Sequence, residues 1–217
     1  MRPLYALQAK AAVAGRKLFD WDDTLTQWEE ALKKRPKAAV FTHISNVFGY
    51  ILPVEEIAAL CRSRGVPFVL DASQSAGVLP ISLRALQADF IAMPGHKGLL
   101  GPQGTGILLC KDQAQPLLYG GTGSESIRQD MPDFLPDRLE AGTVNVPGIA
   151  GLAAGLRYLK QVGIDNILKR EQQQRKRCAA QLQKLGMKPS DVGVYECNEA
   201  FAAQNLGVIR QMEIMSG

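Results

Sequence analysis

The chain has 217 residues, of which 46% are hydrophobic, and this composition predicts a folded globular protein rather than a disordered one. Its 25 basic and 21 acidic residues give a formal charge of +4 and are spread along the chain, with short basic clusters in "LKKRPK" and "QQQRKRC". We interpret both clusters as solvated helix faces, because nucleic-acid binding favours a basic stripe with interleaved aromatic residues.

No apolar run approaches the roughly twenty residues that a membrane-spanning helix requires. The stretch "MRPLYALQAK" also lacks the basic and then apolar plan of a signal peptide. We therefore expect a cytoplasmic protein with no membrane or nucleic-acid partner. The four cysteines include no CxxC pair, so neither a metal site nor a disulfide framework is indicated. We predict small buried or half-buried thiols at Cys61, Cys110, Cys178 and Cys197.

In chain order, the first predicted elements are a strand and a helix. The apolar run "AAVF", residues 38–41, predicts a strand that leads into a loop at Asn46. Residues 53–65 predict a helix, because they begin with a proline and acidic residues, carry apolar residues at helical spacing and end at a glycine.

The pattern then alternates further. "VPFVLDASQ", residues 66–74, predicts a short apolar strand that ends in an acid, which is typical of a buried parallel strand. Residues 83–97 repeat the order of helix, strand and loop, and residues 104–110 predict one more strand. Long helical patterns follow at 145–163 and 166–186. This alternation predicts an α/β fold, three-layered with a mainly parallel sheet, that binds ligands at the carboxyl ends of its strands.

The stretch "MPGHKGLLGPQGTG", residues 93–106, places Lys97 in a run of glycines just after a predicted strand. It is not a P-loop, because Gly98 follows Lys97 where that motif requires Ser or Thr. The glycines are typical of close backbone approach to a bulky planar ligand. A lysine that attacks a carbonyl must be partly desolvated or lie near another cation, and the adjacent His96 would provide that environment.

Asp71, at the end of the preceding strand, supplies the second half of a recognisable constellation. In pyridoxal-phosphate (PLP) sites a lysine carries the cofactor as a Schiff base, while an aspartate near the pyridine nitrogen keeps the ring protonated. Gln74, one helical turn beyond Asp71, would donate to the ring hydroxyl of the cofactor. Taken alone, Asp71 is better explained as the N-cap of a helix in "LDASQS".

Together these residues resemble the cofactor-binding half of the class V aminotransferases, most closely their cysteine desulfurase and selenocysteine lyase relatives. The hallmarks of that family are H-x-SN-x-x-G, then D-x-x-Q, then GHK followed by GP-x-G-x-G. They occur here in that order, in "HISNVFG", "DASQ" and "GHKGLLGPQGTG". The resemblance implies a PLP-dependent transferase fold of type I that acts on an amino acid through a lysine Schiff base.

The resemblance also implies a role for each residue of these motifs. It implies Lys97 as the catalytic Schiff-base lysine, Asp71 as the partner of the pyridine nitrogen and Gln74 as the partner of the ring oxygen. It places His96 near the phosphate of the cofactor and Asn46 against cofactor and substrate.

A second stretch, "RLEAGTVNVPGIAGL", resembles the family segment whose threonine reaches the cofactor phosphate of the partner subunit. The resemblance assigns this role to Thr143 and therefore implies a homodimer. The family often has a serine just before GHK, whereas this chain has Pro94, so the resemblance does not extend to this hydroxyl contact with the phosphate.

The resemblance covers residues 1–183 and begins in the middle of the family's large domain. The family's upstream phosphate loop, its ring-stacking histidine, and its small domain with the substrate-binding arginine and catalytic cysteine are not found in the sequence. We therefore expect a truncated large domain, with a non-catalytic remnant as the alternative to an active enzyme. His43 belongs to the H-x-SN motif and is expected to form a strand-end hydrogen bond. Neither Cys178 nor Cys197 is assigned as a desulfurase nucleophile.

Residues 184–217 do not continue this pattern and resemble the NEAF segment of thiolases, in which the asparagine, here Asn198, positions an oxyanion-hole water. A thiolase-related fragment acting on acyl-CoA is therefore a second alternative. The nucleophilic cysteine and the histidine motif of thiolases are absent from the sequence, and a thioester reaction requires both. The same residues are also explained as an amphipathic helix, with Phe201, Leu206 and Ile209 on its apolar side.

Overall fold

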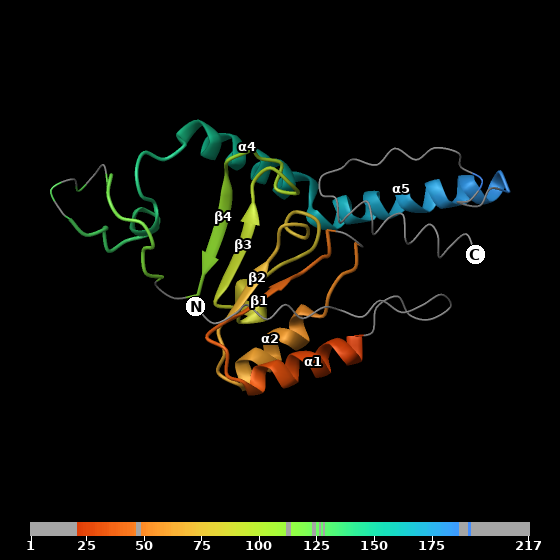
Figure 1. Cartoon of the computed structure of the whole chain (residues 1–217). Coiled ribbons are helices and arrows are strands. Elements are labelled where there is room, and N and C mark those ends of the chain that lie inside the picture. Colours follow the sequence, from red (N-terminus) through yellow and green to blue (C-terminus); the bar gives the residue numbers. More distant parts are fainter. Residues whose placement is uncertain are drawn as a thin grey trace.

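Four short strands form the sheet at the centre of the molecule (Figure 1). They are β1 (Ala39–Thr42), β2 (Phe68–Asp71), β3 (Phe90–Pro94) and β4 (Gly106–Cys110), arranged in the order β1-β2-β3-β4. Strands β1, β2 and β3 are parallel, whereas β4 is antiparallel to β3. The computed structural model describes residues 21–46, 49–111, 114–122, 125, 127, 129–186 and 191. The predicted α/β fold with a mainly parallel sheet is confirmed.

The direction of each strand follows from the connection that precedes it. The crossover from β1 to β2 contains α2 (Val54–Ser63), and the crossover from β2 to β3 contains α3 (Leu83–Leu86). A parallel neighbour needs such a crossover, usually through a helix. Strand β4 instead follows β3 through the loop 95–105, which contains no helix, and it returns antiparallel.

The bounds of α2 confirm the helix predicted at 53–65. Pro53 occupies the N-cap position, and its carbonyl oxygen accepts a hydrogen bond from the Ile57 amide at 3.1 Å. Gly65, just beyond the helix, has a φ of 63°, a left-handed conformation that glycine adopts without steric cost. Ile57 and Cys61, on the inner face of α2, are fully buried.

Helix α1 (Trp21–Lys33) was not among the predicted elements and lies beside α2 (Figure 1). Its inner side carries Leu25, Trp28 and Leu32, which are spaced as on one face of a helix. The Trp28 ring meets the ring of Phe41 in β1 edge to face, with centroids 4.9 Å apart. This aromatic contact joins α1 to the sheet.

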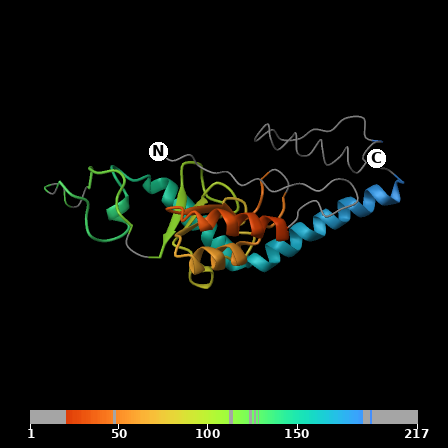
Figure 2. The same ribbon diagram turned by 60° about the horizontal axis from the view of Figure 1, so that its bottom comes forward.

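Helices α4 (Val146–Val162) and α5 (Ile164–Lys184) follow the short 3-10 helix η1 (Asp137–Leu139). They confirm the helices predicted at 145–163 and 166–186, although α5 begins two residues earlier than expected. Figures 1 and 2 show α5 extending away from the sheet, on the side opposite to the segment before α4. No helix in the described part of the chain is long and apolar enough to cross a membrane.

Alternating burial along β2 connects the core to the functional edge of the sheet. Phe68 and Leu70 point into the core, and Leu70, like Ile91 in β3, is fully buried. Asp71 follows Leu70 and is therefore half-buried on the other side of the pleat. The buried residues of β2 thus anchor the strand, and its last residue, Asp71, presents a carboxylate at the edge of the sheet.

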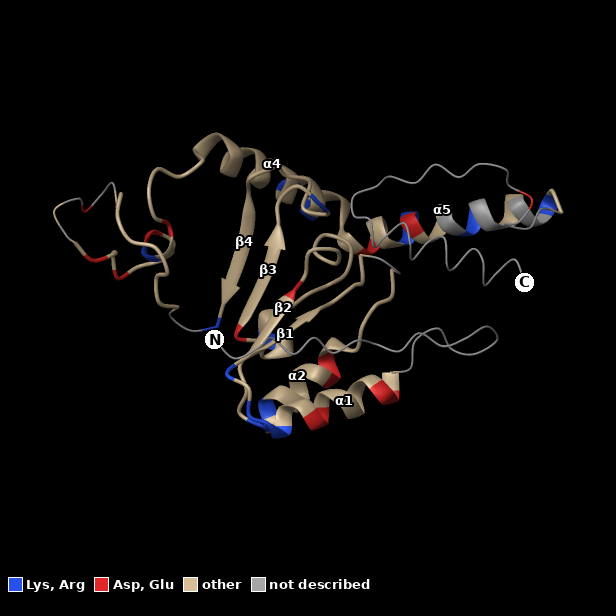
Figure 3. Cartoon of the chain, in the orientation of Figure 1, with Lys and Arg blue, Asp and Glu red and all other residues tan. Residues whose placement is uncertain are grey.

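Charged residues of both signs are dispersed over the helices that surround the sheet (Figure 3). The basic cluster "LKKRPK" lies at the end of α1 and in the exposed connection to β1, so only its first residues are helical. The cluster "QQQRKRC" lies on α5, where its residues 172–174, 176 and 177 are exposed. The prediction of solvated positions agrees with this placement, except that part of the first cluster is a connection rather than a helix face.

Candidate active site at the carboxyl edge of the sheet

Three loops leave the same edge of the sheet. The loop after β1 carries Asn46, the turn after β2 carries Gln74, and the loop after β3 carries His96 and Lys97. Because β1, β2 and β3 are parallel neighbours, their carboxyl ends lie side by side, with Asp71 paired to Thr42 in β1 and to Ala92 in β3. The fold therefore places all the predicted site residues except Thr143 at or after strand ends on one edge of the sheet.

Asp71 is held at this edge by both its backbone and its side chain. Its carbonyl oxygen accepts a hydrogen bond from the His43 amide at 3.0 Å. Its Oδ1 accepts hydrogen bonds from the amide of Ser73 at 2.9 Å and from the Ser73 hydroxyl at 2.5 Å. Residues 73–78 form turns and no helix, so Asp71 does not act as the N-cap of a helix. Its Oδ2 accepts no hydrogen bond from a described residue.

The turn after Asp71 and the loop that carries Lys97 touch backbone to backbone. A Cβ atom on Gly77 would lie 2.0 Å from the carbonyl oxygen of Gly98, and a Cβ atom on Gly98 would lie 2.2 Å from the carbonyl oxygen of Ala76. Any side chain at either glycine would force the two segments apart. This contact therefore sets the relative position of the Asp71 and Lys97 backbones.

The loop that carries Lys97 is also held by hydrogen bonds within it and by packing against α4. The Leu100 amide donates to the Lys97 carbonyl oxygen at 2.9 Å, and the Gly95 amide donates to the Thr105 carbonyl oxygen at 2.7 Å. A Cβ atom on Gly155 of α4 would lie 2.5 Å from the carbonyl oxygen of Leu99. Helix α4 thus approaches the loop as closely as a glycine allows, and the loop has little freedom to shift.

The polar side chains at the edge differ in exposure, but none of them is bound to another side chain or to the backbone in the described part of the chain. Lys97 and Gln74 are half-buried, while His96 and Asn46 are exposed. None of the four side chains forms a hydrogen bond or an ion pair with another described residue. With the free Oδ2 of Asp71, they make an edge whose polar groups are available to a ligand.

Thr143 is not brought to this edge by any contact within the described chain. It is exposed and lies two residues before Asn145, the N-cap of α4, whose side chain accepts a hydrogen bond from the Gly148 amide at 3.0 Å. The family resemblance implied a place for Thr143 in the site of a partner subunit, and that role stays a prediction.

His43, which sequence reasoning treated only as a structural residue, is buried directly beside the site. Its amide forms the expected strand-end hydrogen bond with Asp71, and its carbonyl oxygen accepts a hydrogen bond from the Leu52 amide at 2.9 Å. The residue is only 6% exposed, and its Nδ1 has no hydrogen-bond partner among the described residues. Burial lowers the pKa of His43 below its usual 6.5, and the nearby carboxylate of Glu55 opposes this shift only in part.

The described cysteines are thiols without nucleophilic character. Cys61 is buried in α2, and its burial, together with the charge of Asp89, raises its pKa to about 11. Cys110 at the end of β4 is half-buried, and burial raises its pKa also. Both therefore remain protonated near neutral pH. Among the described residues, no cluster of His, Cys, Asp and Glu could hold a metal ion. The side chains of Cys178 and Cys197 lie outside the described residues.

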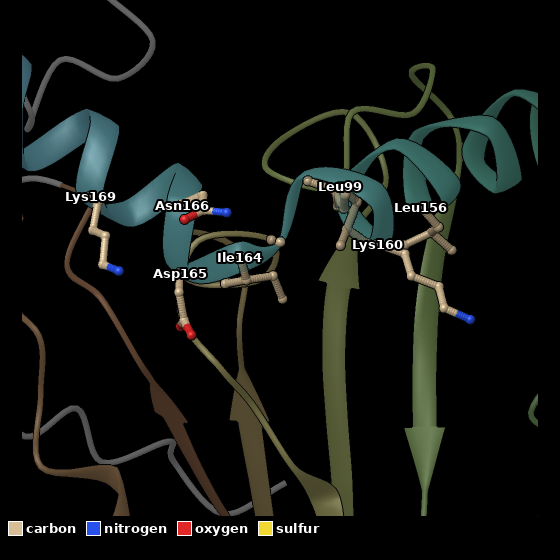
Figure 4. A pocket seen from close by; sticks show the side chains of 10 residues that line it. Leu99, Leu156, Lys160, Ile164, Asp165, Asn166 and Lys169 are labelled. Atoms are coloured by element: carbon tan, nitrogen blue, oxygen red, sulfur yellow. The ribbon is translucent and has the colours of Figure 1, made fainter.

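A cavity of about 620 Å³ lies where α4 meets α5 (Figure 4). It touches the two site loops through Gly77 and Leu99, and its lining includes Lys160 and Lys169. None of the predicted site residues lines it. The edge that carries Lys97 is thus separate from this cavity.

The family model for class V aminotransferases matches residues 10–206, so the chain belongs to the class V aminotransferase family. A probable cysteine desulfurase of Methanothermobacter thermautotrophicus is 40% identical over 148 residues, which are 65% of this chain and 37% of that protein. A probable cysteine desulfurase of Pyrococcus abyssi is 39% identical over 158 residues, which are 70% of this chain and 39% of that protein.

Solved structures of cysteine desulfurases also match this chain. The apo structure of a cysteine desulfurase from Thermococcus onnurineus matches with a TM-score of 0.63 and 36% identity, over 75% of this chain and 42% of that one. The cysteine desulfurase CsdA from Escherichia coli matches with a TM-score of 0.58 and 27% identity, over 72% of this chain and 39% of that one. The chain therefore spans about two fifths of the length of the relatives that it matches.

The family match continues to residue 206 and so overlaps the segment 184–217 that resembles thiolases. Apart from residues 184–186 and 191, this segment lies outside the described residues, Asn198 included. The domain boundary near residue 183 and the thiolase-like segment stay predictions.

We predict that Gly98→Ala destabilises the fold by about 2–3 kcal/mol, because its Cβ would collide with the carbonyl oxygen of Ala76. Urea unfolding of purified protein measures the change. Gly104→Ala is the control: Gly104 has a φ of 74°, but a Cβ atom there would meet nothing within 4 Å, so we expect only the backbone cost of about 1 kcal/mol for the left-handed conformation. Equal losses in the two variants would contradict the Gly77–Gly98 contact.

We also predict that His43 makes stability depend on pH. The folded-state pKa of His43 lies below the unfolded value of 6.5, so its unfolded form binds the proton more readily. His43 should therefore make its whole contribution to the free energy of unfolding above pH 6.5. This contribution should be lost as the pH drops through the folded pKa, by at most about 1.4 kcal/mol per pH unit. His43→Gln should flatten this slope between pH 7 and 5.5. A slope that stays the same in His43→Gln would contradict this role of His43.

Proposed function

We propose that this chain provides the PLP-binding edge of an enzyme that acts on an amino acid, with Lys97 carrying the cofactor as a Schiff base. The observation that carries the proposal is the backbone contact between Gly77 and Gly98, which joins the turn of Asp71 to the loop of Lys97. Family membership supports the same cofactor.

The residues at the edge fit the chemistry of this cofactor. A pyridine nitrogen needs a carboxylate oxygen without another partner, and Oδ2 of Asp71 is such an atom among the described residues. A Schiff base needs an amine free of ion pairs, and Lys97 forms none with a described residue. Bound PLP supplies an electron sink for the charge that develops at the α-carbon of an amino acid.

Each residue then has a defined task. Asp71 would hold the proton of the pyridine nitrogen, and Gln74 would donate to the ring oxygen. His96 would lie near the phosphate, and Asn46 would orient the cofactor and the substrate. Once the substrate amine has displaced it, Lys97 Nζ would take the proton from the substrate α-carbon, a task that requires a neutral amine.

Cysteine is the amino acid that we propose as substrate, since the relatives named above are cysteine desulfurases. Sulfur removal also requires a thiolate acceptor. Cys61 and Cys110 do not supply one, because burial raises the pKa of both thiols. With dithiothreitol as the acceptor, cysteine should yield alanine and sulfide, and dithiothreitol should be oxidised. Transamination would instead release a keto acid.

We further propose a homodimer in which Thr143 reaches the cofactor phosphate bound to the other subunit. The segment before α4 exposes large apolar side chains and extends away from the sheet (Figure 1). Leu117 is 92% exposed there, and Leu118 and Tyr119 are also mostly exposed. Such a group of apolar side chains is typical of a contact surface between subunits. The free thiols Cys61 and Cys110 support a reducing, cytoplasmic location.

The decisive experiment for the cofactor is reductive trapping. PLP is added to the purified chain, the absorbance spectrum is recorded, and borohydride is then used to reduce the Schiff base before peptide mass mapping. We expect a visible absorbance band and a label on Lys97, both lost in Lys97→Ala and both kept in Lys160→Ala, an exposed lysine of α4. A label scattered over surface lysines, or no band, would favour the non-catalytic alternative.

For the subunit contact, we predict that Leu117→Glu raises the dimer dissociation constant at least tenfold, because it places a charge on an apolar contact surface. Analytical ultracentrifugation measures this constant. The control Lys169→Glu, on the exposed side of α5, should leave it unchanged. A monomeric wild-type chain at micromolar concentration would rule out the homodimer.

A further inference from the structure

We infer that Ser73 is a positioning residue that fixes the carboxylate of Asp71 so that one particular oxygen, Oδ2, faces the ligand. The identity of that ligand rests on the proposed function, whereas the positioning of Asp71 is a property of the chain itself. Ser73 belongs to the "DASQ" segment, but none of the roles assigned to that segment from the sequence involves it.

The backbone of Asp71 leaves its side chain as the only part free to turn. Asp71 is paired in register with Thr42 on one side and with Ala92 on the other, and its carbonyl oxygen accepts the His43 amide. Only the side-chain torsions of Asp71 then decide where its two carboxylate oxygens point. A half-buried carboxylate in this position needs a partner that selects one orientation.

Ser73 supplies two donors to the same oxygen. Its amide lies 2.9 Å from Oδ1 of Asp71, and its hydroxyl lies 2.5 Å from that atom. Hydrogen bonds to an ionised carboxylate are stronger than bonds between neutral groups. Two of them on Oδ1 favour one rotamer and leave Oδ2 without a partner among the described residues.

The two donors differ in what the sequence must provide. Any residue other than proline at position 73 would offer the amide, which closes a turn typical of aspartate. Only Ser or Thr would add the hydroxyl. The hydroxyl is therefore the part of this arrangement that depends on the identity of the residue, and it can be removed without removing the turn.

The same turn contains a matched control. Ser75 is fully buried, and its hydroxyl lies 3.5 Å from the carbonyl oxygen of Ala72, but it forms no hydrogen bond with Asp71. Ser75→Ala thus removes a hydroxyl from the same turn without touching the carboxylate. Ser73→Thr keeps the hydroxyl and tests rescue by a conservative change.

The first test uses the cofactor-free chain. Three-bond NMR couplings report whether the χ1 angle of Asp71 occupies a single rotamer. We expect one rotamer in the wild type, in Ser73→Thr and in Ser75→Ala, and averaged couplings in Ser73→Ala. A single rotamer that persists in Ser73→Ala would overturn the inference, and this outcome does not depend on whether the chain binds PLP.

The second test uses the chain titrated with PLP. Ser73→Ala should raise the dissociation constant of PLP about tenfold, the effect of one hydrogen bond to a charged group, and should weaken the circular dichroism of the bound cofactor. Ser75→Ala should lower the stability of the fold but leave both signals unchanged. Unchanged affinity and dichroism in Ser73→Ala would count against the inference. Failure of the wild type to bind PLP at Lys97 would instead contradict the proposed function, and the couplings would then decide the role of Ser73.

Discussion

The close approach of two glycine backbones is the constraint on which the site depends. Gly77 and Gly98 leave no room for a Cβ atom between the turn after β2 and the loop after β3. Without that contact, Asp71 and Lys97 would sit on two independent loops, and their separation would vary with loop motion. The proposed site requires a constant separation of Asp71 and Lys97, which packed backbones maintain better than flexible side chains.

The same principle extends from the loop to the helix that covers it. Helix α4 carries Gly148, Gly151 and Gly155, and each of them approaches the glycine-rich loop too closely for a larger residue to fit without rearrangement. Glycine in a helix interior costs about 1 kcal/mol relative to alanine. The chain therefore gives up helix stability where α4 must lie against the backbone that holds Lys97.

Burial divides the polar groups of this region into two kinds. His43 and Cys61 are buried and Cys110 is half-buried, and burial shifts the pKa of each in the direction that favours its neutral form. The amine of Lys97, at the edge of the sheet, forms no hydrogen bond or ion pair with a described residue. The interior thus contributes neutral packing groups, while the groups able to bind an anionic or electrophilic ligand gather where three strands end.

By itself the sequence determined the alternation of strands and helices, the placement of Asp71 and Lys97 just at or after strand ends, and the family, because these depend on local patterns and short motifs. Tertiary structure alone decided the Gly77–Gly98 contact and the burial of His43, whose Nδ1 has no partner in the described part of the chain. It also showed that Ser73 binds Asp71 and that β4 returns antiparallel. The apolar face of α1 can be recognised in the sequence, but its burial depends on residues elsewhere in the chain, such as Phe41 in β1. Such features arise between segments distant in the chain, where no local pattern states which atoms will meet.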